Sequence, residues 1–166
     1  MGKTGSEIQA PPFPRGLDEH TLEVARFACA YADHVPRSGI DRDIALAGAL
    51  LHDIGKTLGF KSAGPGFSST PEYNLIGHIT PGLAQLSAYR GALPLECHLN
   101  LVHIIQSHHG PNGEILPHTA EAWAVHCADL ASARLRMAGD DVQKCSPGEM
   151  AKKGMRTGVP VYRFRE

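Results

Sequence analysis

The sequence lacks the features that mark membrane and secreted proteins. Its longest apolar run, from Ile44 to Leu51, is far shorter than the roughly 18 residues that a membrane-spanning helix needs. The first residues are polar and rich in proline and glycine, and they contain no apolar signal core. We therefore expect a cytoplasmic protein with no membrane partner.

The sequence also lacks an excess of charge of either sign. Its 16 Lys and Arg residues stand against 17 Asp and Glu residues, which leaves a net charge of −1. Proteins that bind long nucleic acids by neutralising phosphates carry a basic surplus. The balance of charge therefore makes long nucleic acid an improbable partner.

The spacing of the four cysteines excludes two kinds of site. The four cysteines form no Cys-x-x-Cys pair and no zinc-finger spacing. Three of them lie in apolar helical stretches, so we expect buried, reduced thiols rather than a disulfide framework. The four are Cys29, Cys97, Cys127 and Cys145.

Histidine, by contrast, is abundant. There are 10 histidines, as many as Phe, Tyr and Trp combined, and they are scattered through apolar segments rather than gathered in a tag. Many histidines without a surplus of basic charge indicate metal binding or proton transfer.

Apolar periodicity predicts an all-α fold. We expect residues 1–16 to form an irregular arm and residues 17–166 a single helical domain with its core in 17–137, because no strand–helix alternation is present. Residues 59–69 are expected to be a flexible loop, and the residues after Gly139 a short extended tail. The predicted helices run from Leu17 to about Pro36, from a cap at Asp41 to Gly55, from the Ser69–Glu72 start signal to about Arg90 with a kink at Pro81, from Pro94 to Gly110, and from Thr119 to Met137.

Each predicted helix carries histidine or aspartate at the edge of its apolar face. Successive groups are separated by about one helix and one loop, so five neighbouring helices can direct them to one centre. Imidazole and carboxylate ligands suit Zn, Fe, Mn, Co or Ni, and the lack of thiolates disfavours a structural zinc site. In chain order the groups are His20, His52-Asp53, His78, His108-His109 and Asp129.

This ordered set resembles the HD-domain superfamily of metal-dependent phosphohydrolases. Among its branches the sequence is most similar to the HD domain of bacterial 3′–5′ exoribonucleases that carry an OB-fold ahead of it. It differs from the HD-GYP cyclic-di-GMP phosphodiesterases, because Gly-Pro-Asn follows the paired histidines in place of the GYP signature. The matching segments are LDEHTLEVA (17–25), GALLHDIGK (48–56), LIGHI (75–79), IIQSHHG (104–110) and HCADLASAR (126–134).

The resemblance implies an HD-domain bundle of five or more helices with a site for two divalent transition metals (Mn, Fe, Co, Ni or Zn). The first metal would be held by four residues, of which Asp53 would bridge to a second metal held by His78 with one or both of the paired histidines. The first set is His20, His52, Asp53 and Asp129, and the paired histidines are His108 and His109.

The resemblance also implies a mechanism and a substrate class. A metal-activated hydroxide would attack phosphorus, Lys56 could offset the charge on the phosphate, and His109 could protonate the leaving group instead of binding metal. We expect a small, nucleotide-like substrate: a nucleotide, a cyclic nucleotide or a short oligonucleotide. Three alternatives stay open: a 3′–5′ exoribonuclease acting on RNA, a di-iron oxygenase with the same ligand order, and a non-catalytic metal-binding sensor or scaffold.

Overall fold

The chain forms two compact units, Met1–Ala128 and Asp129–Glu166. The structure, a computed structural model, describes residues 14–63, 66–151 and 154–164. The irregular arm expected over 1–16 lies outside the described residues, except that residues 14–16 already belong to the first helix. The single domain expected over 17–166 stays a prediction.

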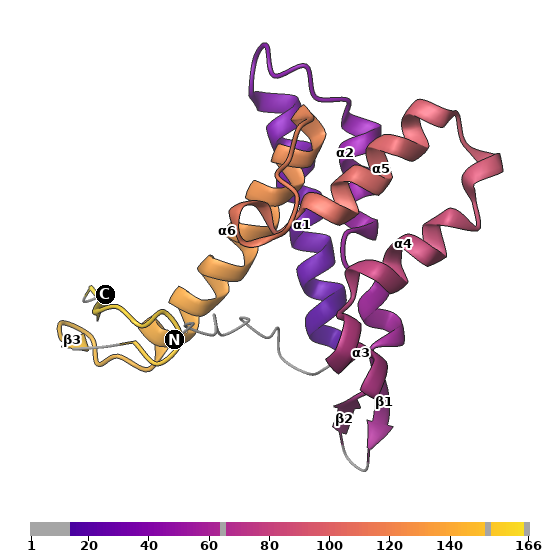
Figure 1. Ribbon diagram of the computed structural model, residues 1–166. Helices are drawn as coiled ribbons and strands as arrows, with labels where there is room; N and C mark the ends of the chain where they lie inside the picture. The colour runs from indigo at the N-terminus through magenta and orange to yellow at the C-terminus, as the bar shows by residue number, and fades with distance from the viewer. Residues whose placement is uncertain (1–13, 64–65, 152–153, 165–166) are drawn as a thin grey trace. The chain divides into compact units, whose positions relative to one another are not determined.

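The first unit is helical, which confirms the predicted all-α class (Figure 1). Three short 3₁₀ helices follow α2, α4 and α5, and a two-stranded hairpin lies between η1 and α3. The elements are α1 (Pro14–His34), α2 (Arg42–Leu51), η1 (Ile54–Leu58), β1 (Phe60–Ala63), β2 (Gly66–Ser69), α3 (Pro71–Ile76), α4 (Ile79–Ser87), η2 (Arg90–Ala92), α5 (Leu95–Ser107), η3 (Gly110–Asn112) and α6 (Ala120–Gln143), which begins here and runs on into the second unit.

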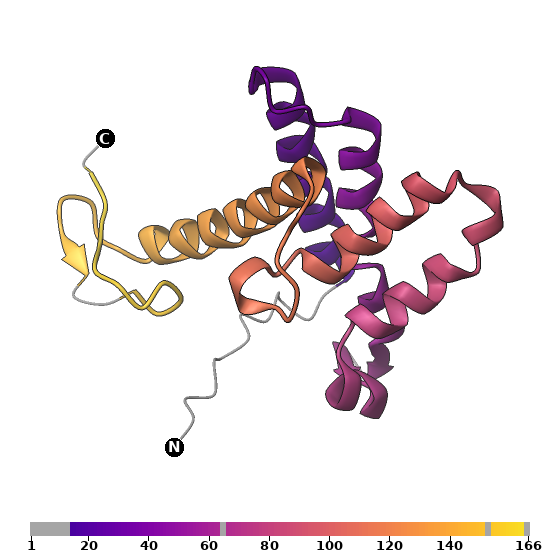
Figure 2. The same ribbon diagram turned by 45° about the horizontal axis from the view of Figure 1, so that its top comes forward.

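Helix α2 lies between α1 and α5 and contacts both, as two views of the ribbon show (Figures 1 and 2). Small residues allow this close approach. A Cβ at Gly48 of α2 would meet the side chain of Ile104 of α5 at 2.6 Å. Ile104 and Ile105 are fully buried, and burial of each side chain contributes about 1.5–3 kcal/mol to stability. The core cluster joins these residues to buried side chains of α1, α4 and the start of α6.

Two of the predicted helix starts are confirmed by their caps. The Asp41 side chain accepts hydrogen bonds from the backbone N–H groups of Asp43 and Ile44. The Thr70 hydroxyl accepts one from Tyr73, and Pro71 occupies the first turn of α3. Each side-chain oxygen satisfies a donor that the helix leaves unpaired.

The segment predicted as one helix to about Arg90 is two helices. The chain breaks at Gly77, which has a left-handed φ of 66°, and α4 starts after His78. Pro81 does not kink a helix, because it lies in the first turn of α4, where an N–H has no intrahelical partner. The break places His78 at a helix start.

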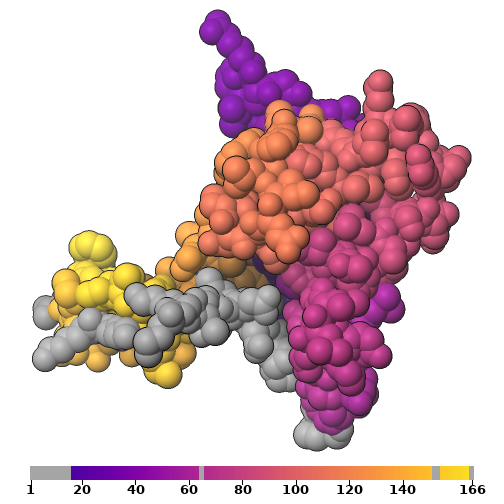
Figure 3. Space-filling model, in the orientation of Figure 1, coloured from indigo at the N-terminus to yellow at the C-terminus, as the bar shows by residue number. Residues whose placement is uncertain are grey.

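The prediction of a flexible loop over 59–69 was wrong in part, because these residues include an antiparallel hairpin. Phe60 pairs with Ser69 and Ala63 with Gly66, and Thr70 donates its N–H to the carbonyl of Gly59. In Figure 3 the magenta segment of this hairpin and α3 projects from the body of the first unit.

The second unit contains the rest of α6 and a short ribbon of β3 (Met150–Ala151) with β4 (Val161–Tyr162). Helix α6 continues past the predicted end at Met137, and the ribbon takes the place of the expected extended tail. The buried Asp141 carboxylate accepts hydrogen bonds from the backbone N–H groups of Arg156 and Thr157, which ties the tail to α6.

All four cysteines are free thiols, as predicted, but their burial is uneven. Cys145 is buried, whereas Cys127 is exposed, which corrects the expectation of a buried thiol at that position. Among the described helices, none is both long and apolar enough to cross a membrane.

Candidate metal centre

The Asp53 carboxylate lies at the centre of a cluster of histidines. His52 and Asp53 follow the end of α2 at Leu51, at the point where the chain changes from α-helix to the 3₁₀ helix η1. Neighbouring residues on an uninterrupted helix point in directions about 100° apart. The change of winding lets His52 and Asp53, which are both buried, serve one centre.

One oxygen of Asp53 faces two histidines. Asp53 Oδ2 lies 3.4 Å from His52 Nε2 and 3.9 Å from His20 Nε2, which comes from α1. One nitrogen atom of His20 and one of His52 lie within 4.8 Å of each other. Both histidines are buried, so α1 and α2 present them to the interior rather than to solvent.

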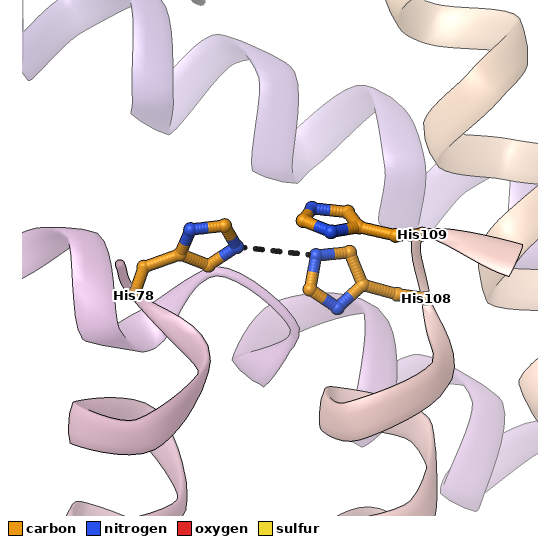
Figure 4. A group of neighbouring side chains, drawn as sticks. All are labelled: His78, His108 and His109. Atoms are coloured by element: carbon orange, nitrogen blue, oxygen red, sulfur yellow. Dashed lines mark hydrogen bonds between the residues drawn. The ribbon is translucent and has the colours of Figure 1, made fainter. Parts of the chain in front are cut away.

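The other oxygen of Asp53 faces a second group of histidines. Asp53 Oδ1 lies 3.2 Å from His78 Nε2 and 3.8 Å from His108 Nε2. These two nitrogen atoms are 3.3 Å apart, and one nitrogen each of His78, His108 and His109 lies within 4.8 Å of the others (Figure 4). His78 comes from the start of α4, while His108 and His109 follow α5, again at a change from α-helix to 3₁₀ helix.

Backbone carbonyls fix the rings of two of these histidines. His52 Nδ1 lies 2.7 Å from the carbonyl oxygen of Ala49, and His108 Nδ1 lies 2.7 Å from that of Ile105. A carbonyl can only accept, so both Nδ1 atoms carry a proton and donate. When such a ring is neutral, it presents the lone pair of Nε2 to the centre, which is the arrangement typical of metal-ligating histidines.

Burial and neighbouring charges shift two pKa values at the centre. Burial is the main reason that the pKa of His78 is lowered to about 4. The attraction of Asp53 raises this pKa in part, while the positive charges of Lys56, His109 and His52 lower it further. Burial alone would raise the pKa of Asp53. The charge and hydrogen bonding of His52, with Lys56 and His108, nevertheless hold it well below its usual range. At neutral pH the centre thus offers a neutral imidazole and a carboxylate.

Comparisons with known proteins show which family and which relatives this chain resembles. The family model for the HD domain matches residues 17–134. The chain is 34% identical over 147 residues to the 3′–5′ exoribonuclease YhaM of Bacillus subtilis, covering 85% of this chain and 46% of the relative. It is 36% identical over 144 residues to the dihydroneopterin 2′,3′-cyclic phosphate phosphodiesterase of Methanocaldococcus jannaschii, covering 80% of this chain and 55% of the relative.

The chain belongs to the HD domain family. The predicted resemblance is therefore confirmed. This HD domain chain spans about half the length of the two curated relatives. It is also similar to a solved structure, the phosphodiesterase PgpH HD domain of L. monocytogenes, with 21% identity and a TM-score of 0.48 over 71% of this chain and 67% of that one.

The HD domain residues fit the metals that the family implies. Asp53 Oδ1 is buried and forms no hydrogen bond among the described residues, although His78 Nε2 and His108 Nε2 are its neighbours. Lone pairs of neutral imidazoles and a carboxylate oxygen repel one another unless a cation lies between them. The donor set of nitrogen and oxygen atoms suits divalent transition metals.

The structure brings together six of the predicted ligands in the first unit, and their role as ligands stays a prediction. They are His20, His52, Asp53, His78, His108 and His109. The seventh, Asp129, is the first residue of the second unit and continues helix α6 directly after the buried Ala128.

Lys56 contacts the centre through Asp53. Its Nζ donates to Asp53 Oδ2 at 2.6 Å, and the side chain is 19% exposed. The single turn of η1 that separates the two residues makes this contact possible. Lys56 thus offsets the charge of the carboxylate and still reaches solvent.

Two features of the centre were not predicted from the sequence. Gly55 allows η1 to approach α4, because a Cβ there would collide with the carbonyl oxygen of His78. His126, which does not belong to the ordered set of candidate ligands, contacts the backbone that carries His108. Neither contact has a signal in sequence spacing, since both join segments that only the fold brings together.

Proposed function

We propose that this HD domain is a metal-dependent phosphohydrolase that cleaves a phosphoester bond in a small, nucleotide-like substrate. One observation carries the proposal: the two oxygens of the buried Asp53 face two separate groups of histidine nitrogens. A carboxylate in this position can bind one cation through each oxygen. The cytoplasmic location expected from the sequence stays a prediction.

The proposed ligands divide between the two oxygens. His20, His52 and Asp53 would hold the first ion, completed by the Asp129 carboxylate that the family resemblance assigns to it. His78 and His108 would hold the second ion with Asp53. Divalent ions bound here would activate water and neutralise phosphoryl oxygens, which is the chemistry that paired metals supply in phosphatases and nucleases.

The protein's own groups supply the remaining functions. Cleavage of a phosphoester leaves an oxygen that needs a proton. His109 is half-buried beside His108 and His78, with ring centroids 4.2 and 5.1 Å away, and we assign it as the proton donor. The partly exposed ammonium of Lys56 can offset the negative charge that grows on the phosphate.

The relatives support phosphoester hydrolysis and bracket the size of the substrate. The names of the two relatives describe one enzyme that acts on a cyclic phosphate of dihydroneopterin and one that degrades RNA from its 3′ end. We favour the small substrate, because the net charge of −1 provides no surplus for binding many phosphates. Exoribonuclease activity is the second candidate.

The proposal is tested by assaying purified chain, freed of metal and reloaded with Mn, Fe, Co, Ni or Zn, against cyclic nucleotides, nucleotides and dinucleotides. Asp53→Asn keeps the size of the side chain but removes its charge. We expect this variant to lose bound metal and at least 100-fold in kcat/KM. Substitutions of residues that only orient metal ligands already reduce metal affinity or activity 10–100-fold.

Asp33→Asn is the matched control. Asp33 is exposed and pairs with Arg42 on the surface, so this variant should keep its activity. Full activity of Asp53→Asn, or activity that does not depend on any added metal, would contradict the proposal.

A further inference from the structure

His126 lies beside the centre without belonging to either group of candidate ligands. It sits on the part of α6 that belongs to the first unit, and it is 7% exposed. Its Nδ1 is 2.7 Å from the carbonyl oxygen of His108. Because a carbonyl only accepts, His126 Nδ1 carries the proton and donates it in this hydrogen bond.

The ring of His126 also packs closely against Gly110, two residues after His108. Gly110 has a left-handed φ of 57°, and a Cβ there would collide with the His126 ring. The same ring also meets Trp123 edge-on, with centroids 5.8 Å apart. The backbone that carries His108 and His109 is thus covered by a ring that has little room to move.

Two hydrogen bonds therefore hold His108, one through its ring and one through its backbone carbonyl. The His108 ring donates to the carbonyl of Ile105 on α5, and the His108 carbonyl accepts from His126 on α6. The first bond orients the ring and the second fixes the backbone. Without the second, the left-handed glycine would leave the turn a wider choice of conformations.

We propose that His126 is a positioning residue: it fixes the backbone turn at His108–Gly110 and so sets the affinity of the ion held by His78 and His108 with Asp53, without binding that ion itself. The inference rests on the proposed metal centre. It assigns a function to a histidine that the ligand pattern leaves unused. Changes to residues that orient ligands reduce metal affinity about 10–100-fold.

Three substitutions separate the hydrogen bond from the ring. His126→Asn places an amide N–H near the position of Nδ1, His126→Gln places one near Nε2 instead, and His126→Leu has no donor. His98→Leu is the control, because His98 is also buried (5% exposed) but belongs to neither group.

The readout is the affinity for Mn²⁺ of each variant, measured by titration of metal-free chain, with thermal unfolding in parallel. The ion in question is the one that His78→Ala removes. We expect its dissociation constant to rise at least tenfold in His126→Leu and His126→Gln. It should change no more than about threefold in His126→Asn and His98→Leu. The other ion should bind as in the wild type.

Three results would overturn the inference. Wild-type affinity in His126→Leu would show that the turn keeps its conformation without the His126 hydrogen bond. Equal loss of affinity for both ions would show a general effect on folding. Loss in His126→Asn as large as in His126→Leu would indicate that His126 is itself a ligand.

The outcome is independent of catalysis. If the affinities change as expected but no phosphoester is cleaved, the proposed function fails and the role of His126 stands. If the wild-type chain holds no ion that His78→Ala removes, both fail together.

Discussion

At the scale of single residues, the adjacent pairs His52-Asp53 and His108-His109 each follow the end of an α-helix where a 3₁₀ turn begins. Two neighbours on a regular helix could not both face one point. The change from α-helix to 3₁₀ helix, together with the left-handed conformation of Gly110, allows both residues of such an adjacent pair to face the same centre. The local backbone is therefore as much a part of the centre as the side chains.

Gly55 provides a prediction at this scale. Gly55→Ala should destabilise the protein by about 1–3 kcal/mol and weaken the ion bound through His78, because the new methyl group would push the His78 carbonyl away. Urea unfolding and Mn²⁺ titration measure the two effects. Gly91→Ala is the control, since a Cβ there meets open space. Unchanged stability and affinity in Gly55→Ala would show that the approach of η1 to α4 is not critical.

The candidate ligands were predictable from the sequence, but their supporting contacts were not. His20, His52 and His78 stand out because they belong to an ordered set with one group on each predicted helix. The roles of Gly55 and His126 depend on contacts with His78 and His108, and no periodicity links those positions. Residue type predicts chemistry, whereas only the fold shows which backbone a side chain supports.

At the scale of elements, Glu121 joins three segments of the first unit. The buried carboxylate of Glu121 accepts from the backbone N–H of Asp41, the cap of α2, and from the side-chain amide of Asn100 on α5. The Thr119 hydroxyl donates to the same Asn100 side chain. The start of α6 is thereby tied to the two helices whose ends carry His52 and His108.

Glu121→Ala should lower the free energy of unfolding by about 1–3 kcal/mol, because it removes the charged acceptor of two partly buried hydrogen bonds. Chemical denaturation measures the change, and Glu114→Ala, at an exposed position, is the control. Hydrogen bonds from Asp41 and Asn100 outweigh the effect of burial, which by itself would raise the pKa, and hold the pKa of Glu121 below its usual value.

The pH dependence of this contribution follows from the lowered pKa of Glu121. The stability that the ionised carboxylate provides is fully present above its unfolded pKa and disappears as the pH falls through the folded pKa. The difference between wild type and Glu121→Ala should therefore shrink in acid. A difference that stays constant down to pH 2, or no difference at neutral pH, would contradict this account.

The helices were predictable as elements more reliably than their ends and connections. Caps at Asp41 and Thr70 gave correct starts, because the side-chain hydrogen bond is local. The hairpin at 60–69 was missed, since its polar and glycine-rich residues carry no alternating pattern. The sequence predicted a kink at Pro81, whereas the helix is interrupted at Gly77. The error arose because a proline in the first turn of a helix and a proline inside a helix look alike in sequence.

At the scale of the whole molecule, charge predicts which substrates bind well. With a net charge of −1, the chain should cleave a cyclic nucleotide or a dinucleotide with a higher kcat/KM than a 30-residue RNA. Each phosphate that a protein neutralises steepens the salt dependence of binding. The KM for the small substrates should therefore vary only weakly with salt.

The measurement is kcat/KM and KM for the three substrates over a series of salt concentrations. If the long RNA is the best substrate and its advantage collapses as salt rises, the chain has a basic groove. Exoribonuclease activity would then replace the proposed function.

The central claim is that Asp53 bridges two metal ions, and electron paramagnetic resonance of the chain loaded with Mn²⁺ tests it most directly. Ions sharing a carboxylate lie about 3.5–4 Å apart and are spin-coupled. We predict two bound Mn²⁺ per chain with the signal of a coupled pair, and loss of that signal in Asp53→Asn. A single bound ion, or two ions that show only the signal of isolated Mn²⁺, would contradict the account.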